Sequence, residues 1–325
     1  MTSRKIIAPL QEIYSRYKPL VSLCVTCLVL ALLVRFTGIR LDDFRVLKTI
    51  PLGSLALLLA ASLFFRLTLG YNFRLLMLFF RVKLTFREWF GLTAVSTMTN
   101  YLLPVKAGTL AQAAYLKKAH AFNYALFVSS LVGFYSVTFL VNAVAGLALS
   151  LIEFHANFVA GNKVILFFCV VTLVTFIPFV LLGISRRLAI RPELLKRVLK
   201  GIELFFKEKR VMTRFILSQI LVIFAIGLRF LFAFWALGVH IDYLSCTIVA
   251  LVTSFSIFLS ITPANIGIKE FFMVASSTAL GINASEAMMV AVVDRGVDIL
   301  SSFAAGGAFS YLLVKKPRES SRDPI

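Results

Sequence analysis

The sequence predicts an all-α, polytopic helical membrane protein with about eight membrane segments. Hydrophobic residues make up 60% of the 325 residues, well above the ~45–50% that is usual in soluble domains. Several apolar stretches reach the about 20 residues that a helix needs to cross a bilayer. Two of the apolar stretches are interrupted by Pro-x-x-x-Gly. We therefore expect six full spans and two broken, re-entrant hairpins, arranged as an inverted repeat.

The apolar runs place these segments in two membrane halves rather than in two soluble domains. The first half is expected to cover residues 1–158 and the second half residues 159–325. The expected segments are 19–37, 50–66 with a helical extension towards Phe80, hairpin 88–118, 121–152, 164–184, 213–238, hairpin 243–280 and 286–314.

Each hairpin contains one of the two breaks. The first break is Pro104-Val-Lys-Ala-Gly108, preceded by Asn100, and the second is Pro263-Ala-Asn-Ile-Gly267. They lie 159 residues apart (263 minus 104), about half the chain. A chain of this composition is expected to contain roughly 0.5 Pro-x-x-x-Gly matches by chance, so a single match would not be significant. Paired breaks at matching positions of two halves indicate a transport site, because irregular backbone at membrane depth must be buried in protein or line a wet cavity.

The net charge of +19 is explained by the topology rather than by nucleic-acid binding. The basic residues lie in short stretches between apolar spans, as is typical of cytoplasmic loops. This pattern predicts a multi-pass protein with both termini in the cytoplasm, the first hairpin entering from the cytoplasm and the second from outside. The basic loop 35–48 goes against this arrangement. The stretches assigned to the inside are the N-terminus, 66–118, 186–214 and the C-terminus, and those assigned to the outside lie near residues 155, 240 and 282.

Residues 194–210 are predicted to form an amphipathic basic helix on the cytoplasmic surface. Apolar residues recur there at helical spacing, with lysines and arginines between them. Such a helix suits contact with anionic lipids. It is equally well explained as a docked linker helix with a solvated basic face.

Three charged residues, Asp294, Arg295 and Asp298, interrupt an otherwise apolar span. A charge at the bilayer centre costs at least ~2.5–3.5 kcal/mol, so these side chains must face protein or water. Arg295 and Asp298 are three residues apart, share a helix face and are able to pair. The group is either an internal ion pair that fixes two helices or a cation site for a phosphate-bearing substrate.

Lys106 lies two residues after Pro104 and Lys269 six residues after Pro263, each beside the start of a new helix. A helix N-terminus favours an anion, and a nearby lysine strengthens such a site. Alternatively, Lys106 extends to the cytoplasmic surface, and Glu270 caps its helix or pairs with a basic residue. Asn100 is expected to bond free backbone groups beside the first break.

The sequence contains no motif of a known enzyme class and no metal-ligand spacing. Cys24 and Cys27 have CxxC spacing but lie inside an apolar span, where they are best explained as small helix residues. We therefore expect neither enzymatic activity nor a cofactor.

These motifs together resemble the lysylphosphatidylglycerol synthase transmembrane, or flippase-like, family over roughly residues 15–314. Leu103-Pro104-Val-Lys106-Ala-Gly108 is similar to the family element Leu-Pro-Gly-Arg-Ala-Gly-Glu. Thr262-Pro263-Ala-Asn-Ile-Gly267 with Glu270 is similar to Ser-Pro-Gly-Gly-Ile-Gly-x-x-Glu, and Asp294-Arg295-x-x-Asp298 resembles the acidic-Arg-x-x-Asp pattern. The departures are concentrated at the first element, at Val105, Lys106, Thr109 and Gln112.

The resemblance implies movement of a lipid between leaflets. We expect no counterpart of the soluble domain that transfers an aminoacyl group in full-length members of the family, because the membrane segments occupy most of this sequence. We expect translocation or binding of an anionic phospholipid or lipid-linked headgroup near the second break. The substrate-binding residues would be Lys106, Lys269, Glu270, Arg295 and Asp298. The alternative is a non-transporting membrane partner of a lipid-modifying or glycosyltransferase system.

Overall fold

The computed structural model describes residues 31, 35, 50–102, 107–155, 158–185, 208–259 and 262–315, which form helices and their connecting turns. Apart from residues 31 and 35, the first expected span lies outside the described residues, as do the basic segment 194–207, the polar tail, Pro104 and Lys106. The elements are α2 (Leu52–Phe79), α3 (Phe86–Leu102), α4 (Ala107–His120), α5 (Tyr124–Glu153), α6 (Phe158–Ser185), α8 (Lys209–Ala236), α9 (Tyr243–Ser254), η2 (Phe255–Leu259), η3 (Pro263–Asn265), α10 (Ile268–Ala279) and α11 (Ala284–Lys315).

The all-helical expectation is confirmed for the described part of the chain. The described helices lie close to the predicted ranges, and α2 continues to Phe79 as its predicted extension requires. Within the described residues, three helices are long and apolar enough to cross a membrane: Leu52–Phe79, Leu126–Glu153 and Lys209–Ala236. The protein is therefore a multi-pass membrane protein, whereas the total of six spans stays a prediction.

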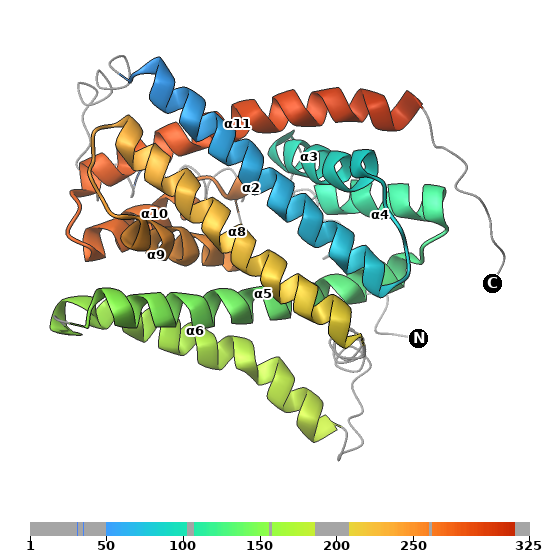
Figure 1. Ribbon diagram of the computed structural model, residues 1–325, viewed down its shortest axis with the longest axis horizontal. Helices are drawn as coiled ribbons and strands as arrows, with labels where there is room; N and C mark the ends of the chain where they lie inside the picture. Colours follow the sequence, from blue (N-terminus) through green and yellow to red (C-terminus); the bar gives the residue numbers. More distant parts are fainter. Residues whose placement is uncertain are drawn as a thin grey trace, which may run out of the picture.

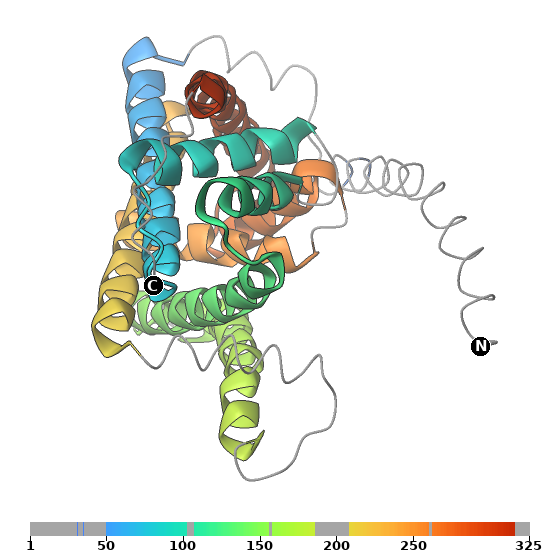
Figure 2. The ribbon, with the colours of Figure 1, turned by 90° about the vertical axis from the view of Figure 1, so that its right-hand side faces the viewer.

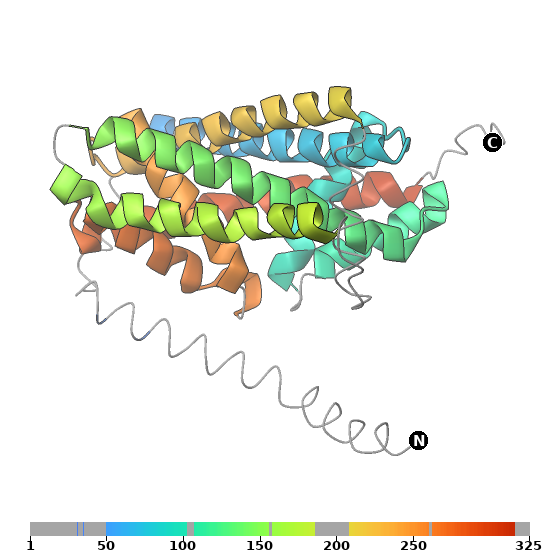
Figure 3. The ribbon, with the colours of Figure 1, turned by 90° about the horizontal axis from the view of Figure 1, so that it is seen from below.

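Successive long helices run in alternating directions between the left and right ends of the molecule (Figure 1). Helices α2 and α8 pack along each other and run in opposite directions, and the same is true of α5 and α6. The start of α2, the end of α8, the α5–α6 turn and the start of α11 lie at the left of Figure 1, and the opposite ends of these helices lie at the right. The view from below shows α2 and α8 on one side of the molecule and α10 on the other (Figure 3).

Helices α3 and α4 form one hairpin, and α9 to α10 form the other. Figure 2 shows α3 and α4 from the end at which α2 finishes and α8 begins. In the second hairpin, helix α9 passes into the 3₁₀ turns η2 and η3, and the chain becomes helical again at Ile268. Ala264, Asn265 and Gly267 have positive φ values of 49°, 58° and 83°. Backbone that leaves the helix in this way is the feature that the second Pro-x-x-x-Gly predicts.

The outer surface is apolar. On α6 and α8, large side chains are exposed, among them Leu173 at 70% and Leu217 at 61%. A soluble protein would expose few such faces, whereas lipid tails cover them without penalty.

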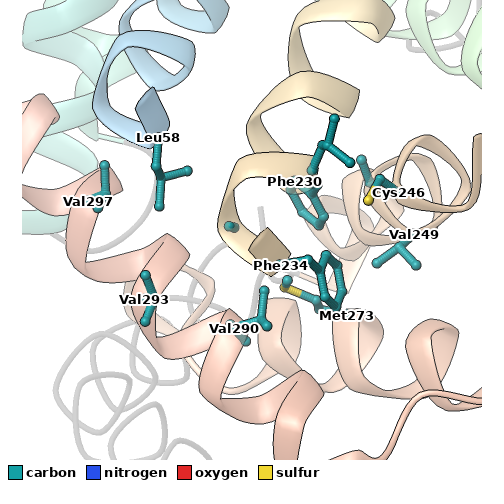
Figure 4. Packing of buried hydrophobic residues seen from close by; sticks show 13 residues of the cluster. Leu58, Phe230, Phe234, Cys246, Val249, Met273, Val290, Val293 and Val297 are labelled. Atoms are coloured by element: carbon teal, nitrogen blue, oxygen red, sulfur yellow. The ribbon is translucent and has the colours of Figure 1, made fainter. Parts of the chain in front are cut away.

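The interior is packed where the two halves meet. Figure 4 shows the cluster in which Phe234 of α8 lies beside Met273 of α10 and Val290 of α11; Phe230 of α8 and Val293 of α11 belong to the same cluster. Leu58 contributes from α2, so both halves of the chain share one core. This packing sets the position of α11, whose next residue after Val293 is the charged Asp294.

Candidate functional site

The second break is held by the helix that follows it. Glu270 is the third residue of α10 and is 5% exposed. Its Oε2 accepts a hydrogen bond of 2.7 Å from the backbone N–H of Gly267, the N-cap of the helix. Only a residue without Cβ adopts the φ of 83° at Gly267 without strain. Glu270 therefore acts as a cap, which was one of the two roles predicted for it.

Arg295 of α11 binds the same loop. Its Nε donates to Glu270 Oε1. The two terminal nitrogens donate to the carbonyl oxygens of Ala264 at 3.2 Å and of Asn265 at 3.3 Å. The guanidinium thus bonds a carboxylate and two carbonyls that the broken helix leaves free.

Asp294 joins three helices. Its Oδ1 accepts a hydrogen bond of 2.7 Å from Arg229 of α8, and its Oδ2 accepts one of 2.8 Å from Lys269 of α10. Asp294 is 1% exposed, and the side chain of Arg229 is 4% exposed. A carboxylate buried to this degree is tolerated because it is paired on both sides.

Asp298 lies one turn further along α11 and joins the two halves of the chain. Its Oδ1 is 2.8 Å from Arg66 Nη2 of α2 and 3.2 Å from Arg229 Nη1 of α8. Its Oδ2 accepts a hydrogen bond of 2.5 Å from the hydroxyl of Tyr101, near the end of α3.

Arg66 is almost completely buried against α11. Its Nη2 also lies within hydrogen-bond distance of Ser301 Oγ at 2.9 Å and of Ser302 Oγ at 2.6 Å. Its Nε is buried and has no hydrogen-bond partner. The arginine therefore retains one donor that the protein does not use.

Together these contacts form one charge cluster with an excess of positive charge. Among the described residues the cluster holds four cations and three carboxylates, a formal charge of +1 (4 minus 3). The cations are Arg66, Arg229, Lys269 and Arg295, and the carboxylates are Glu270, Asp294 and Asp298.

The predicted binding residues include the most accessible members of this charge cluster. The side chains of Lys269, Asp298 and Arg295 are 23%, 15% and 13% exposed. Arg66, Arg229 and Asp294 are at most 4% exposed and support them from within. A ligand that enters the cluster would reach Lys269 and Arg295 first.

Arg295 and Asp298, whose spacing allows them to pair, have other partners, and the internal ion pairs that join helices are made by Asp294 and Asp298 with other residues. Both residues are on α11, but Arg295 bonds Glu270 and two loop carbonyls, and the carboxylate of Asp298 is taken by two other arginines and a tyrosine. Spacing along one helix could not reveal this, because the stronger partners come from other helices.

Sequence reasoning missed three members of the site, namely Arg66, Arg229 and Tyr101. Arg229 is flanked by apolar residues in the middle of a predicted span, which was a signal that it faces protein. Arg66 was grouped with the basic residues at the cytoplasmic end of its span, so it was not expected to be buried. Nothing in the local sequence of Tyr101 distinguishes it.

The first break is described only at its edges, since residues 103–106 lie outside the described part. Asn100 Oδ1 accepts a hydrogen bond of 2.9 Å from the backbone N–H of Gly108, near the start of α4. Gly108 packs so closely on α3 that a Cβ there would be 2.0 Å from the carbonyl oxygen of Ser96. Both contacts hold the two arms of this hairpin together.

A hollow of about 460 Å³ lies just beyond the C-terminal end of α8 and includes His240 and Glu286. It contains no member of the charge cluster; Met289, its nearest lining residue along α11, precedes Asp294 by five positions (294 minus 289). We place the candidate site at the charge cluster because the paired charges and the broken helix are there. Within the described residues, no group of His, Cys, Asp and Glu could hold a metal ion.

Paired charges beside a broken helix, inside a bundle with an apolar outer surface, define a polytopic helical membrane protein. The family model described as lysylphosphatidylglycerol synthase TM region matches residues 20–306, most of the chain, and the protein belongs to this family. The predicted family is thus confirmed. Neither a curated protein nor a solved structure gave a match.

Proposed function

We propose that this protein binds the anionic headgroup of a phospholipid or lipid-linked molecule in the charge cluster and moves it between the leaflets of the inner membrane. The supporting observation is a cluster of charge +1 at a helix break within apolar helices. Charged residues at this depth are costly, which favours a functional role for them. The accessible cations Lys269 and Arg295 would contact the phosphate.

The geometry favours cationic side chains, rather than the N-terminus of α10, as the binding site for an anion. The start of α10 is already capped by Glu270, which accepts from Gly267 N–H. An incoming phosphate would therefore bind the side chain of Lys269, at the second position of the same helix, rather than that backbone donor. Glu270 would position Arg295 rather than touch the lipid.

We further propose that the halves form an inverted repeat around this site. The lengths of successive elements support it: α2 and α8 have 28 residues each, and α3 with 17 residues matches α9 with 12 plus η2 with 5. Helices α4 and α10 have 14 and 12 residues, and α5 and α11 have 30 and 32. Equivalent long helices run in opposite directions in Figure 1. Such repeats move against each other in transporters that alternate access to a central site.

A flipping assay in reconstituted vesicles tests the proposal. Vesicles with fluorescent phosphatidylglycerol in both leaflets would be treated with a membrane-impermeant quencher, so that the rate of further quenching reports lipid movement. We expect wild-type protein to accelerate movement over protein-free vesicles and Lys269→Gln to reduce that acceleration about tenfold or more.

The matched control is Lys163→Gln, which removes an exposed lysine from α6, away from the cluster. It should move lipid at the wild-type rate. Wild-type vesicles that quench no faster than empty vesicles would rule out transport of this lipid. Equal rates in Lys269→Gln and wild type would exclude the charge cluster as the site.

A further inference from the structure

We infer that three buried amide side chains fix the register of α2 against α8 and thereby place two arginines of the charge cluster. The amide chain consists of Asn72 of α2, Gln219 of α8 and Asn142 of α5, and its first bond, between Asn72 and Gln219, is the amide pair. These are positioning residues, because they act on the charge cluster through the helices that carry them. Their effect on register stands by itself, whereas their effect on lipid movement rests on the proposed function.

The amide chain crosses the interior of the bundle from α2 to α5. Asn72 Nδ2 donates a hydrogen bond of 2.6 Å to Gln219 Oε1, and Gln219 Nε2 donates one of 2.8 Å to Asn142 Oδ1. The three residues are 1%, 1% and 6% exposed. A buried amide that loses its partner keeps the full cost of leaving water, so each bond strongly favours the arrangement that forms it.

The amide pair shows how α2 and α8 face each other. Because the two helices are antiparallel, the numbers of facing residues add to 291 (72 plus 219). Leu58 and Ala233 have this sum (58 plus 233) and lie in one core cluster. Phe79 and Met212, at the other end of the helices, also have it (79 plus 212) and pack against a second cluster. One register therefore holds along the whole contact.

The amide pair selects this register among those that apolar packing allows. Apolar side chains such as Leu58 and Phe230 make non-directional contacts, and a shift of one turn would exchange them for similar ones. A hydrogen bond between two amides is directional, so a shift of one turn, about 5.4 Å, breaks it and leaves both groups unpaired. A polar residue in an apolar helix contact specifies register at a cost in stability. Asn72 shows this cost, since its Oδ1 is a buried acceptor without a donor.

The register sets the positions of two arginines relative to Asp298. Arg66 precedes Asn72 by six residues (72 minus 66), about 9 Å along α2. Arg229 follows Gln219 by ten residues (229 minus 219), about 15 Å along α8. Since the helices are antiparallel, both arginines lie on the same side of the amide pair, where they approach Asp298 Oδ1 to 2.8 and 3.2 Å. A shift of about 5.4 Å would remove one arginine from this carboxylate.

Disulfide cross-linking measures the register directly. In a background without native cysteines, Ala233→Cys would be combined with Leu58→Cys at the facing position or with Ser54→Cys one turn earlier on α2. With the native amides we expect the first combination to cross-link and the second to react only weakly, because a disulfide requires Cβ atoms about 3.5–4.5 Å apart. Asn72→Leu should raise the ratio of the second cross-link to the first about tenfold.

Two further variants separate a change of register from general loosening. Asn142→Leu also removes one bond of the amide chain and leaves Gln219 Nε2 without its acceptor, but it keeps the amide pair and should retain the wild-type cross-linking ratio. Asn72→Gln combined with Gln219→Asn exchanges the shorter and the longer amide and should restore that ratio in full. Asn72→Ala gives the same readout should Asn72→Leu not fold.

The vesicle assay measures the consequence for lipid movement. Asn72→Leu should reduce the acceleration of phosphatidylglycerol movement about tenfold, and the exchanged pair should restore it. Cross-linking ratios that are equal in wild type and Asn72→Leu would overturn the inference. A rise in Asn142→Leu as large as that in Asn72→Leu would also overturn it, because general loosening would then explain both.

The two readouts separate this inference from the proposed function. If wild-type protein moves no lipid, the proposed function falls, while the cross-links still decide whether the amide pair sets the register. A shifted register with unchanged lipid movement would keep the role of the amide pair and exclude the placement of the two arginines as a determinant of transport.

Discussion

At the scale of single residues, Arg229 holds the charge cluster together. It contacts Asp294 at 2.7 Å and Asp298 at 3.2 Å, and its guanidinium lies 5.7 Å from the centre of the Phe65 ring. Removing one partner from a buried ion pair leaves the other charge uncompensated. Arg229 is therefore the residue whose loss affects most of the cluster at once.

We expect Arg229→Leu to destabilise the protein by about 3–5 kcal/mol, because the buried Asp294 and the partly buried Asp298 both lose a partner. Thermal unfolding in detergent measures the change. Arg214→Leu, an exposed arginine of the same helix, is the control and should unfold close to wild type. Similar unfolding of the two variants would contradict the central role of Arg229.

At the scale of elements, the α3–α4 hairpin depends on one close approach. Gly108→Ala places a methyl group 2.0 Å from the carbonyl oxygen of Ser96, so the two helices must separate. We expect a loss of about 1–3 kcal/mol of stability, as for other overpacked sites. Gly53→Ala is the matched control, because nothing lies within 4 Å of its added carbon. Unfolding measurements that rank Gly53→Ala as the more harmful change would refute this account.

The start of α3 and the end of α4 are joined by a carboxylate, that of Glu88. Glu88, in the first turn of α3 and outside the three apolar spans, bonds the His120 ring at 2.9 Å and the backbone N–H of Thr85 at 2.8 Å. Burial by itself would raise the pKa of Glu88, but the hydrogen bonds from His120 and Thr85 outweigh it and lower the pKa from 4.5 to about 2.

A lowered folded-state pKa gives a defined pH dependence. The contribution of Glu88 is complete above its unfolded pKa of 4.5 and is lost as the pH falls towards about 2. We expect wild type to be more stable than Glu88→Gln at pH 6, and the difference to shrink between pH 4.5 and 2. Unfolding curves across this range test it, and a constant difference would contradict it.

The elements were largely predictable, whereas their contacts were not. Apolar runs and the second Pro-x-x-x-Gly predict helices and a break, because both depend on local sequence. The bonds of Arg66 to Asp298 and Ser302 join residues 232 and 236 positions apart. No spacing rule reaches that distance, so two of the seven members of the charge cluster, Arg66 and Arg229, were not identified from the sequence. Asp294 and Asp298 were visible because charges in an apolar span are conspicuous.

At the scale of the whole molecule, the inverted arrangement predicts which side of the membrane each hairpin faces. We expect a cysteine at Ala107 to react with an impermeant thiol reagent from the cytoplasmic side and one at Ala264 to react from outside. Intact cells and inverted vesicles carrying the variants, in a background without native cysteines, supply the two sides. Reaction of both positions from the same side would contradict the inverted repeat.

The bond between Tyr101 and Asp298 has a thermodynamic consequence. It makes the docking of α3 depend on the same carboxylate that neutralises Arg66 and Arg229. An anion that took these arginines from Asp298 would leave the carboxylate with Tyr101 as its main donor and would strengthen that bond. By reciprocity, undocking of α3 would lower the affinity for the anion by the same factor. Occupancy of the charge cluster and the position of the first hairpin would then form one linked equilibrium.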